Sequence, residues 1–135
     1  MIPKFRAWDK RQNVMRDVAV LHFTKSGKVN SIEYWKTHYE LKPYHVRNIE
    51  LMQSTGLKDK NGVEIFEGDV VFRKDGECSF KGIVKKDRFY FYIEGTNIRD
   101  SFSFEDVADV QTGEADLEVI GNIYENPELM KEVRK

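Results

Sequence analysis

The sequence has few of the residues that disulfides and metal centres require. Cys78 is the only cysteine among 135 residues, so no disulfide can form within the chain and no thiolate cluster can hold zinc. The three histidines, His22, His38 and His45, lack the His-x-His or His-Glu-x-x-His spacing that directs two imidazoles at one metal. We therefore expect no metal site and no cofactor.

Long apolar runs are also absent. A membrane-spanning helix needs about 20 consecutive apolar residues, and no run in this chain approaches that length. The first residues, MIPKFR, lack the apolar centre of a secretion signal. Hydrophobic residues make up 40% of the chain and charged residues 33%, a balance typical of soluble globular proteins. We expect a folded cytoplasmic protein without membrane contact.

Recognisable catalytic motifs are missing as well. The segment Ser26–Val29 is similar to part of a phosphate loop, but His22 stands where the first glycine belongs and Val29 where a magnesium-binding hydroxyl belongs. A calcium loop beginning at Asp59 would need its glycine at the sixth position, whereas Gly62 is the fourth. There is no Gly-x-Ser-x-Gly elbow. We expect a protein that is not an enzyme.

An acidic series near the C-terminus leaves one catalytic alternative open. These carboxylates would hold magnesium for a nuclease-like reaction if they converged, but a solvated acidic edge is the favoured explanation because nothing in their spacing brings them together. The series consists of Glu105, Asp106, Asp109, Glu114, Asp116 and Glu118.

Strand signals outnumber helix signals along the chain. Alternation predicts strands around Phe5–Ala7, over Val14–Phe23 and over Val29–Trp35, with Thr24–Lys28 as a hairpin turn. The segment Lys36–Asn48 contains a proline and favours an irregular connection.

The second half continues this pattern with short strands at close spacing. Alternation over Arg88–Ile93 places Phe89, Phe91 and Ile93 on an inner face, and Arg88, Tyr90 and Tyr92 on the outer one. Asn126 and Pro127 predict a short helix to about Val133. The other predicted strands are Val70–Arg73, Lys81–Lys86, Ser101–Phe104 and Leu117–Tyr124.

Three segments resemble a known family. They are KFRAWD (Lys4–Asp9), LMQSTGLKDKNGVEIFEGDVV (Leu51–Val71) and EVIGNIYENP (Glu118–Pro127). In order and spacing they resemble the YopX-like proteins of phages and prophages. The resemblance implies a mainly β protein from a mobile genetic element, and it implies no particular chemistry. The segment Gly68–Val71 with the short strands after it is also similar to SH3-like barrels.

These observations together predict a mainly β fold of two parts. We expect residues 1–50 to form a small N-terminal β unit, packed on a small SH3-like barrel with a short terminal helix over residues 51–135. Residues 1–68 carry 12 Lys/Arg against 8 Asp/Glu, and residues 69–135 carry 10 against 15, so the halves have net charges of +4 and −5. Opposite charge favours a homo-oligomer, and we expect a binding protein that also contacts a host or phage protein.

Nucleic acid is the alternative partner. Exposed aromatic rings stack on bases while nearby cations meet phosphates, a pattern that small barrels often use. Residues 72–100 have a net charge of only +2, which argues against a dedicated nucleic-acid binder. The candidate contact residues are Lys85, Lys86, Arg88, Tyr90 and Tyr92.

Overall fold

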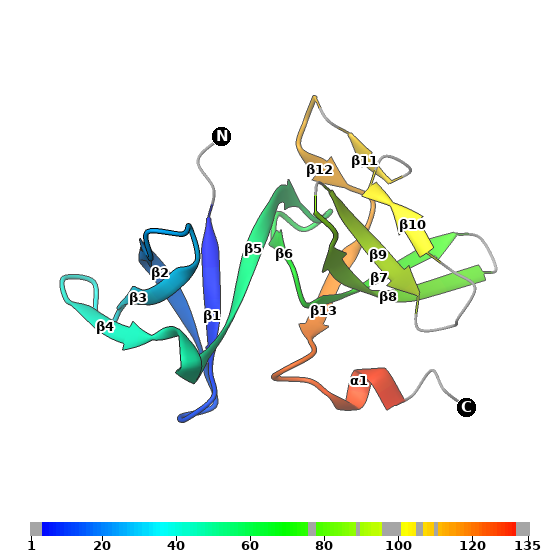
Figure 1. The fold of residues 1–135 in the computed structure, drawn as a ribbon. Coiled ribbons are helices and arrows are strands. Elements are labelled where there is room, and N and C mark those ends of the chain that lie inside the picture. Colours follow the sequence, from blue (N-terminus) through cyan, green and yellow to red (C-terminus); the bar gives the residue numbers. More distant parts are fainter. Residues whose placement is uncertain are drawn as a thin grey trace. The chain divides into compact units, whose positions relative to one another are not determined.

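The computed structural model describes residues 4–75, 78–88, 90–95, 101–104, 107–109 and 111–131 (Figure 1). Strands dominate these residues, which confirms the prediction of a mainly β protein. The chain divides into two compact units, an N-terminal unit that runs to Gln53 and a C-terminal unit that begins at Ser54. The boundary falls within one strand, β5 (Ile49–Lys58).

The N-terminal unit is one antiparallel sheet in the order β5-β1-β2-β3-β4, to which β5 contributes its first residues. A 3₁₀ turn over Val46–Asn48 leads from β4 into β5. The hairpin predicted at Thr24–Lys28 is confirmed, because the Thr24 N–H donates to the Lys28 carbonyl at 2.7 Å. The other strands are β1 (Phe5–Asp9), β2 (Val14–Phe23), β3 (Val29–Trp35) and β4 (Leu41–His45).

Strand β4 corrects the prediction of an irregular connection over Lys36–Asn48. Pro43 lies inside β4 and opposite Glu33 of β3. Because β4 is the last strand of the sheet, a residue without an N–H donor is tolerated there. Proline therefore marks an edge strand here rather than a loop.

A β-bulge in β2 decides which side chains face the core of this unit. Val18 pairs with Tyr34 and Val20 pairs with Glu33, so Ala19 is an extra residue on β2. The bulge interrupts the alternation, and as a result Val18 and Leu21 pack on the same side. They join a core of four buried residues, Ala7, Ile32, Tyr34 and Ile49.

The C-terminal unit contains a five-stranded sheet and several short strands. The sheet has the order β10-β9-β8-β7-β13, and the second part of β5 pairs with two of the short strands, β6 and β12. The sheet strands are β7 (Asp69–Asp75), β8 (Cys78–Lys86), β9 (Phe91–Gly95), β10 (Ser101–Ser103) and β13 (Glu118–Asn122). The short elements are β6 (Glu64–Phe66), β11 (Ala108–Asp109), β12 (Glu114–Ala115) and α1 (Glu128–Lys131).

Over the described residues this sheet is open, with β10 and β13 at its two ends, so the predicted closure into a small barrel is wrong. Closure depends on which strands meet, and alternation along a strand does not specify its partners. The predicted likeness to SH3-like barrels is not confirmed. Of the helix predicted from Pro127 to about Val133, the structure describes only the single turn α1, and residues 132–135 lie outside the described residues.

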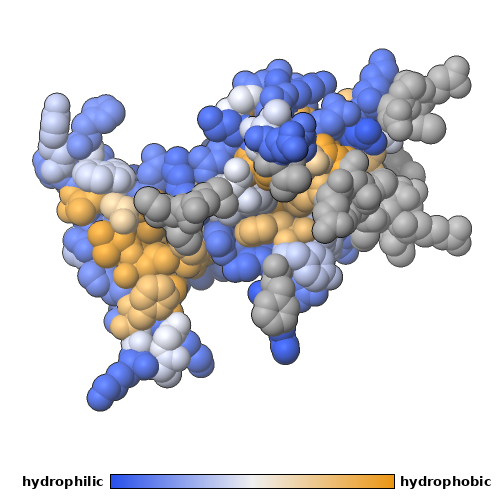
Figure 2. Space-filling view, turned by 90° about the horizontal axis from the view of Figure 1, so that it is seen from above, coloured by the Kyte–Doolittle hydropathy of each residue, from blue (hydrophilic) through white to orange (hydrophobic). Residues whose placement is uncertain are grey.

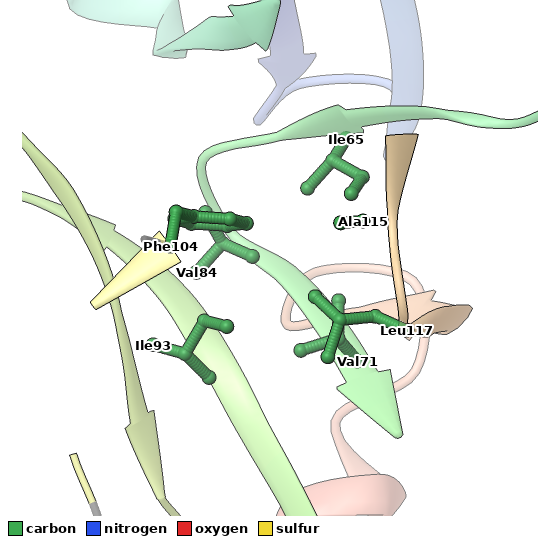
Figure 3. Close-up of a cluster of buried hydrophobic side chains, with 7 residues drawn as sticks. All are labelled: Ile65, Val71, Val84, Ile93, Phe104, Ala115 and Leu117. Carbon is green, nitrogen blue, oxygen red and sulfur yellow. The ribbon is translucent and has the colours of Figure 1, made fainter. Parts of the chain in front are cut away.

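The core of the C-terminal unit gathers side chains from the sheet and from the short strands (Figure 3). Ile93 is fully buried and Phe91 packs on the same cluster, which confirms their predicted inner face, while Phe89 lies outside the described residues. The buried cluster consists of Ile65, Val71, Val84, Ile93, Phe104, Ala115 and Leu117.

Candidate binding surfaces

Asp59, in the longest of the three resembling segments, is a buried residue whose carboxylate accepts backbone hydrogen bonds. Its side chain is 1% exposed. One carboxylate oxygen, Oδ1, accepts the backbone N–H groups of Asn61 at 2.8 Å and Val63 at 2.9 Å. The other, Oδ2, accepts the N–H of Val119 at 2.9 Å. The carboxylate therefore fixes the turn after β5 and joins it to β13.

Asp9 has a similar role at the end of β1, where it too is 1% exposed. Its Oδ1 accepts the Tyr44 hydroxyl at 2.9 Å and the Arg11 N–H at 2.9 Å, and Arg16 Nη2 lies 3.3 Å from Oδ2. Burial raises the pKa of Asp9, but hydrogen bonds from Tyr44, from the backbone of Gln12 and Arg11, and from Arg16 outweigh burial and hold that pKa below 3.8. Asp9 thus links β4 to the turn between β1 and β2.

The acidic series does not form a metal site in the part of the chain that is described. No group of three or more His, Cys, Asp or Glu side chains there has an arrangement that fits a metal ion. Asp109 accepts the N–H of Gln111 at 2.9 Å within its own turn, and Asp116 lies 3.4 Å from Arg73. Glu105 and Asp106 lie outside the described residues.

The three histidines have separate surroundings. His22 Nε2 lies 2.8 Å from a carboxylate oxygen of Glu33, and the His38 ring meets the Tyr39 ring edge-on. His45 accepts the N–H of Arg47 at 3.1 Å. Each imidazole therefore meets a different neighbour, and the structure does not bring the three to one centre.

The predicted nucleic-acid residues are only partly brought together. Lys85 lies opposite Tyr92 in the β8–β9 register, and the Tyr90 and Tyr92 rings have their centroids 6.0 Å apart. Lys86 lies opposite Phe91, so it projects to the other side of the sheet. Arg88 lies in the turn between β8 and β9. One face thus carries Lys85, Tyr90 and Tyr92, which we call the tyrosine ridge.

Acidic groups reduce the positive charge of the tyrosine ridge. Lys85 forms an ion pair with Glu94. Asp87 accepts the N–H of Arg88 at 2.7 Å, and its hydrogen bond with the Tyr90 hydroxyl raises the pKa of Tyr90 above 10.0. Tyr90 is nevertheless 56% exposed, so its ring is available to a ligand.

A second surface, on the N-terminal unit, was not found by sequence reasoning. It is an apolar groove of about 440 Å³. Phe23 on its wall is 59% exposed. Figure 2 shows that apolar side chains gather on the surface of this unit. The groove is lined by Lys4, Phe5, Val18, Ala19, Leu21, Phe23 and Gln53.

The groove exists because of the bulge at Ala19. Without a bulge, regular alternation would put Val18 and Val20 on one face of the sheet, and Leu21 and Phe23 on the opposite face. The extra residue instead brings Leu21 beside Val18. The signal for the groove in the sequence was therefore weak, since it consisted of apolar residues at both even and odd positions of β2.

Charge is divided between the two units more sharply than between the halves of the chain. Residues 1–53 contain 10 Lys/Arg and 5 Asp/Glu, and residues 54–135 contain 12 and 18. The N-terminal unit therefore has a formal charge of +5 and the C-terminal unit −6. This division follows the unit boundary at Ser54.

Comparison with known protein families gives a match for this chain. The model of the YopX protein family matches residues 4–131. The chain belongs to the YopX family. The prediction from the three segments is thereby confirmed, and the YopX match extends over both units.

A solved structure is similar to this chain over nearly its whole length. The crystal structure of protein EF1440 from Enterococcus faecalis is similar, with 30% sequence identity and a TM-score of 0.66. The match covers 96% of this chain and 99% of that one. A search of curated proteins gives no match. Among the described residues of this YopX chain, no helix has the length and hydropathy that crossing a membrane requires.

Proposed function

We propose that this YopX chain acts by binding and not by catalysis, and that it associates with further copies of itself. The observation that carries the proposal is the charge division, +5 on the N-terminal unit and −6 on the C-terminal unit. Oppositely charged surfaces steer association and fix its register. Contact between the basic N-terminal unit of one copy and the acidic C-terminal unit of another brings opposite charges together.

Exposed apolar side chains support binding to a protein as well. Phe23 is 59% exposed, Trp35 47% and Tyr39 94%, and all three lie in the N-terminal unit. Large exposed aromatic residues are enriched at protein interfaces. With the family resemblance to phage and prophage proteins, this supports a host or phage protein as the second partner, in the cytoplasm.

Sedimentation velocity tests the self-association. We expect oligomers at low salt that dissociate as the salt concentration rises, because screening acts beyond about 10 Å at 0.1 M ionic strength. A monomer at tens of micromolar protein and low salt would refute the proposal.

Nucleic acid is the second candidate, and the tyrosine ridge is the observation that favours it. The ring centroids of Tyr90 and Tyr92 lie 6.0 Å apart on one face of the sheet, and Lys85 lies opposite Tyr92. A stacked base contributes about 1–3 kcal/mol. The acidic partners Asp87 and Glu94 weigh against this candidate.

Fluorescence anisotropy with short labelled single-stranded oligonucleotides tests whether the chain binds nucleic acid. For the ridge, binding must fall steeply between about 50 and 200 mM salt and must be lost when both tyrosines are replaced by alanine. We expect little binding at physiological salt. Micromolar binding that the double replacement abolishes would put nucleic acid first.

A further inference from the structure

The apolar groove beside Phe23 has the composition of a docking site. We propose that it binds a segment of a partner protein in which apolar side chains are flanked by acidic ones. The inference rests on the proposed function, since it names the chemistry of the protein partner and the place where that partner docks.

The apolar character of the groove requires an apolar occupant. Phe5, Val18 and Leu21 are half-buried and line it, and Phe23 is 59% exposed on its wall. Val18 and Leu21 also pack on the buried core of the unit, so the groove has a fixed floor. A volume of about 440 Å³ lies within the range of ordinary ligand pockets, which is about 300–1,000 Å³.

Cations in the lining and in the turn after Phe23 favour an acidic occupant. Lys4 is in its lining, and none of the lining residues is acidic. The turn that follows Phe23 carries Lys25 and Lys28, both exposed. Neither lysine has a carboxylate partner within the described part of the chain, so both are available to carboxylates of a ligand. Charge complementarity therefore selects acidic segments over basic ones.

Nuclear magnetic resonance of the full chain with labelled methyl groups tests this directly. The probe is a synthetic peptide, acetyl-Glu-Leu-Glu-Phe-Glu-Leu-Glu-amide, and its control has lysine in place of each glutamate. We expect the acidic peptide to shift the methyl signals of Val18 and Leu21, and the lysine peptide to leave them unchanged. Replacing Phe23 by serine should lower the affinity for the acidic peptide about tenfold, because an aromatic anchor is lost.

The variant Val63→Ser is the matched control. Val63 is 48% exposed and lies in the C-terminal unit, so its replacement should leave the affinity unchanged. A dispersed methyl spectrum will show that each variant is folded.

Three results would overturn the proposal. They are the absence of shifts up to about 1 mM peptide, equal binding of the two peptides, and unchanged affinity of Phe23→Ser. Shifts of Val18 and Leu21 that follow the protein's own concentration without peptide would assign the groove to a second copy instead. Because sedimentation measures self-association without any peptide, failure of the groove and failure of the proposed function are distinguishable.

Discussion

Removal of the Asp59 carboxylate should destabilise the fold. Asp59 is 1% exposed, and its carboxylate accepts three backbone N–H groups. Each of these part-buried hydrogen bonds contributes about 1 kcal/mol, so Asp59→Ala should lower the free energy of unfolding by about 3 kcal/mol. Urea denaturation measures the loss.

Asp109 supplies the control for Asp59. It also accepts N–H groups of its own turn, from Gln111 and Thr112, but it is exposed. Water can replace its carboxylate, so Asp109→Ala should cost less than about 1 kcal/mol. Similar losses at the two positions would mean that burial of the Asp59 carboxylate is not what makes it important.

Asp9 should make stability depend on acid pH. Its pKa lies below 3.8 in the folded chain, so its contribution is present above the pKa of the unfolded chain and is lost as the pH falls through the folded-state pKa. The difference in stability between the parent and Asp9→Asn should therefore shrink as the pH falls below 3.8. Denaturation from about pH 6 to about pH 2 measures it. A difference that stays constant over this range would contradict the role of the ionised carboxylate.

Strand β9 tests the predicted faces at the scale of an element. Ile93 is fully buried in the core of the C-terminal unit, whereas Tyr92 faces the other side. Ile93→Ala should cost about 2–5 kcal/mol, as deletion of a buried aliphatic side chain does. Tyr92→Ala should cost less than half as much. Thermal denaturation compares the two, and equal losses would show that the faces of β9 are assigned wrongly.

Local signals were enough for some elements and not for others. Strands β2 and β3 and the turn between them follow from alternation and turn residues, and both strands have the predicted bounds. Strand β4 was missed because Pro43 reads as a breaker unless its place at the sheet edge is known. Closure of the second sheet was predicted wrongly because strand pairing is a tertiary property.

The candidate surfaces divide in the same way. Alternation over Arg88–Ile93 puts Tyr90 and Tyr92 on one face, and the centroids of their rings are 6.0 Å apart in the structure. The groove could not be predicted, since a bulge at Ala19 turns Leu21 toward Val18. A bulge depends on the partner strand, which sequence periodicity does not contain.

At the scale of the whole molecule, the resembling segments contribute to the fold and to the groove. Asp9 and Asp59, from two of the segments that resemble the family, accept hydrogen bonds in turns and hold the fold. Phe23, Lys25 and Lys28 lie outside those segments. The groove therefore combines residues of the family segments, Lys4, Phe5 and Gln53, with residues outside them.

Association between unlike units has a further consequence. A contact in which the basic unit of one copy meets the acidic unit of the next is heterologous, and such contacts generate rings or open chains. We therefore expect assemblies that grow with protein concentration unless a ring closes.

The most direct measurement is sedimentation equilibrium on two variants of equal net charge. Lys25→Glu with Lys28→Glu lowers the charge of the N-terminal unit from +5 to +1, and Lys58→Glu with Lys60→Glu changes the C-terminal unit from −6 to −10. All four lysines are exposed. Both variants have a net charge of −5, against −1 for the parent.

If unlike units attract, the first variant should associate more weakly than the parent, and the second at least as strongly, at low salt. Far-ultraviolet circular dichroism will establish that both are folded. Equal weakening of the two variants would show that only the net charge matters, and an unassociated parent protein would contradict the account altogether.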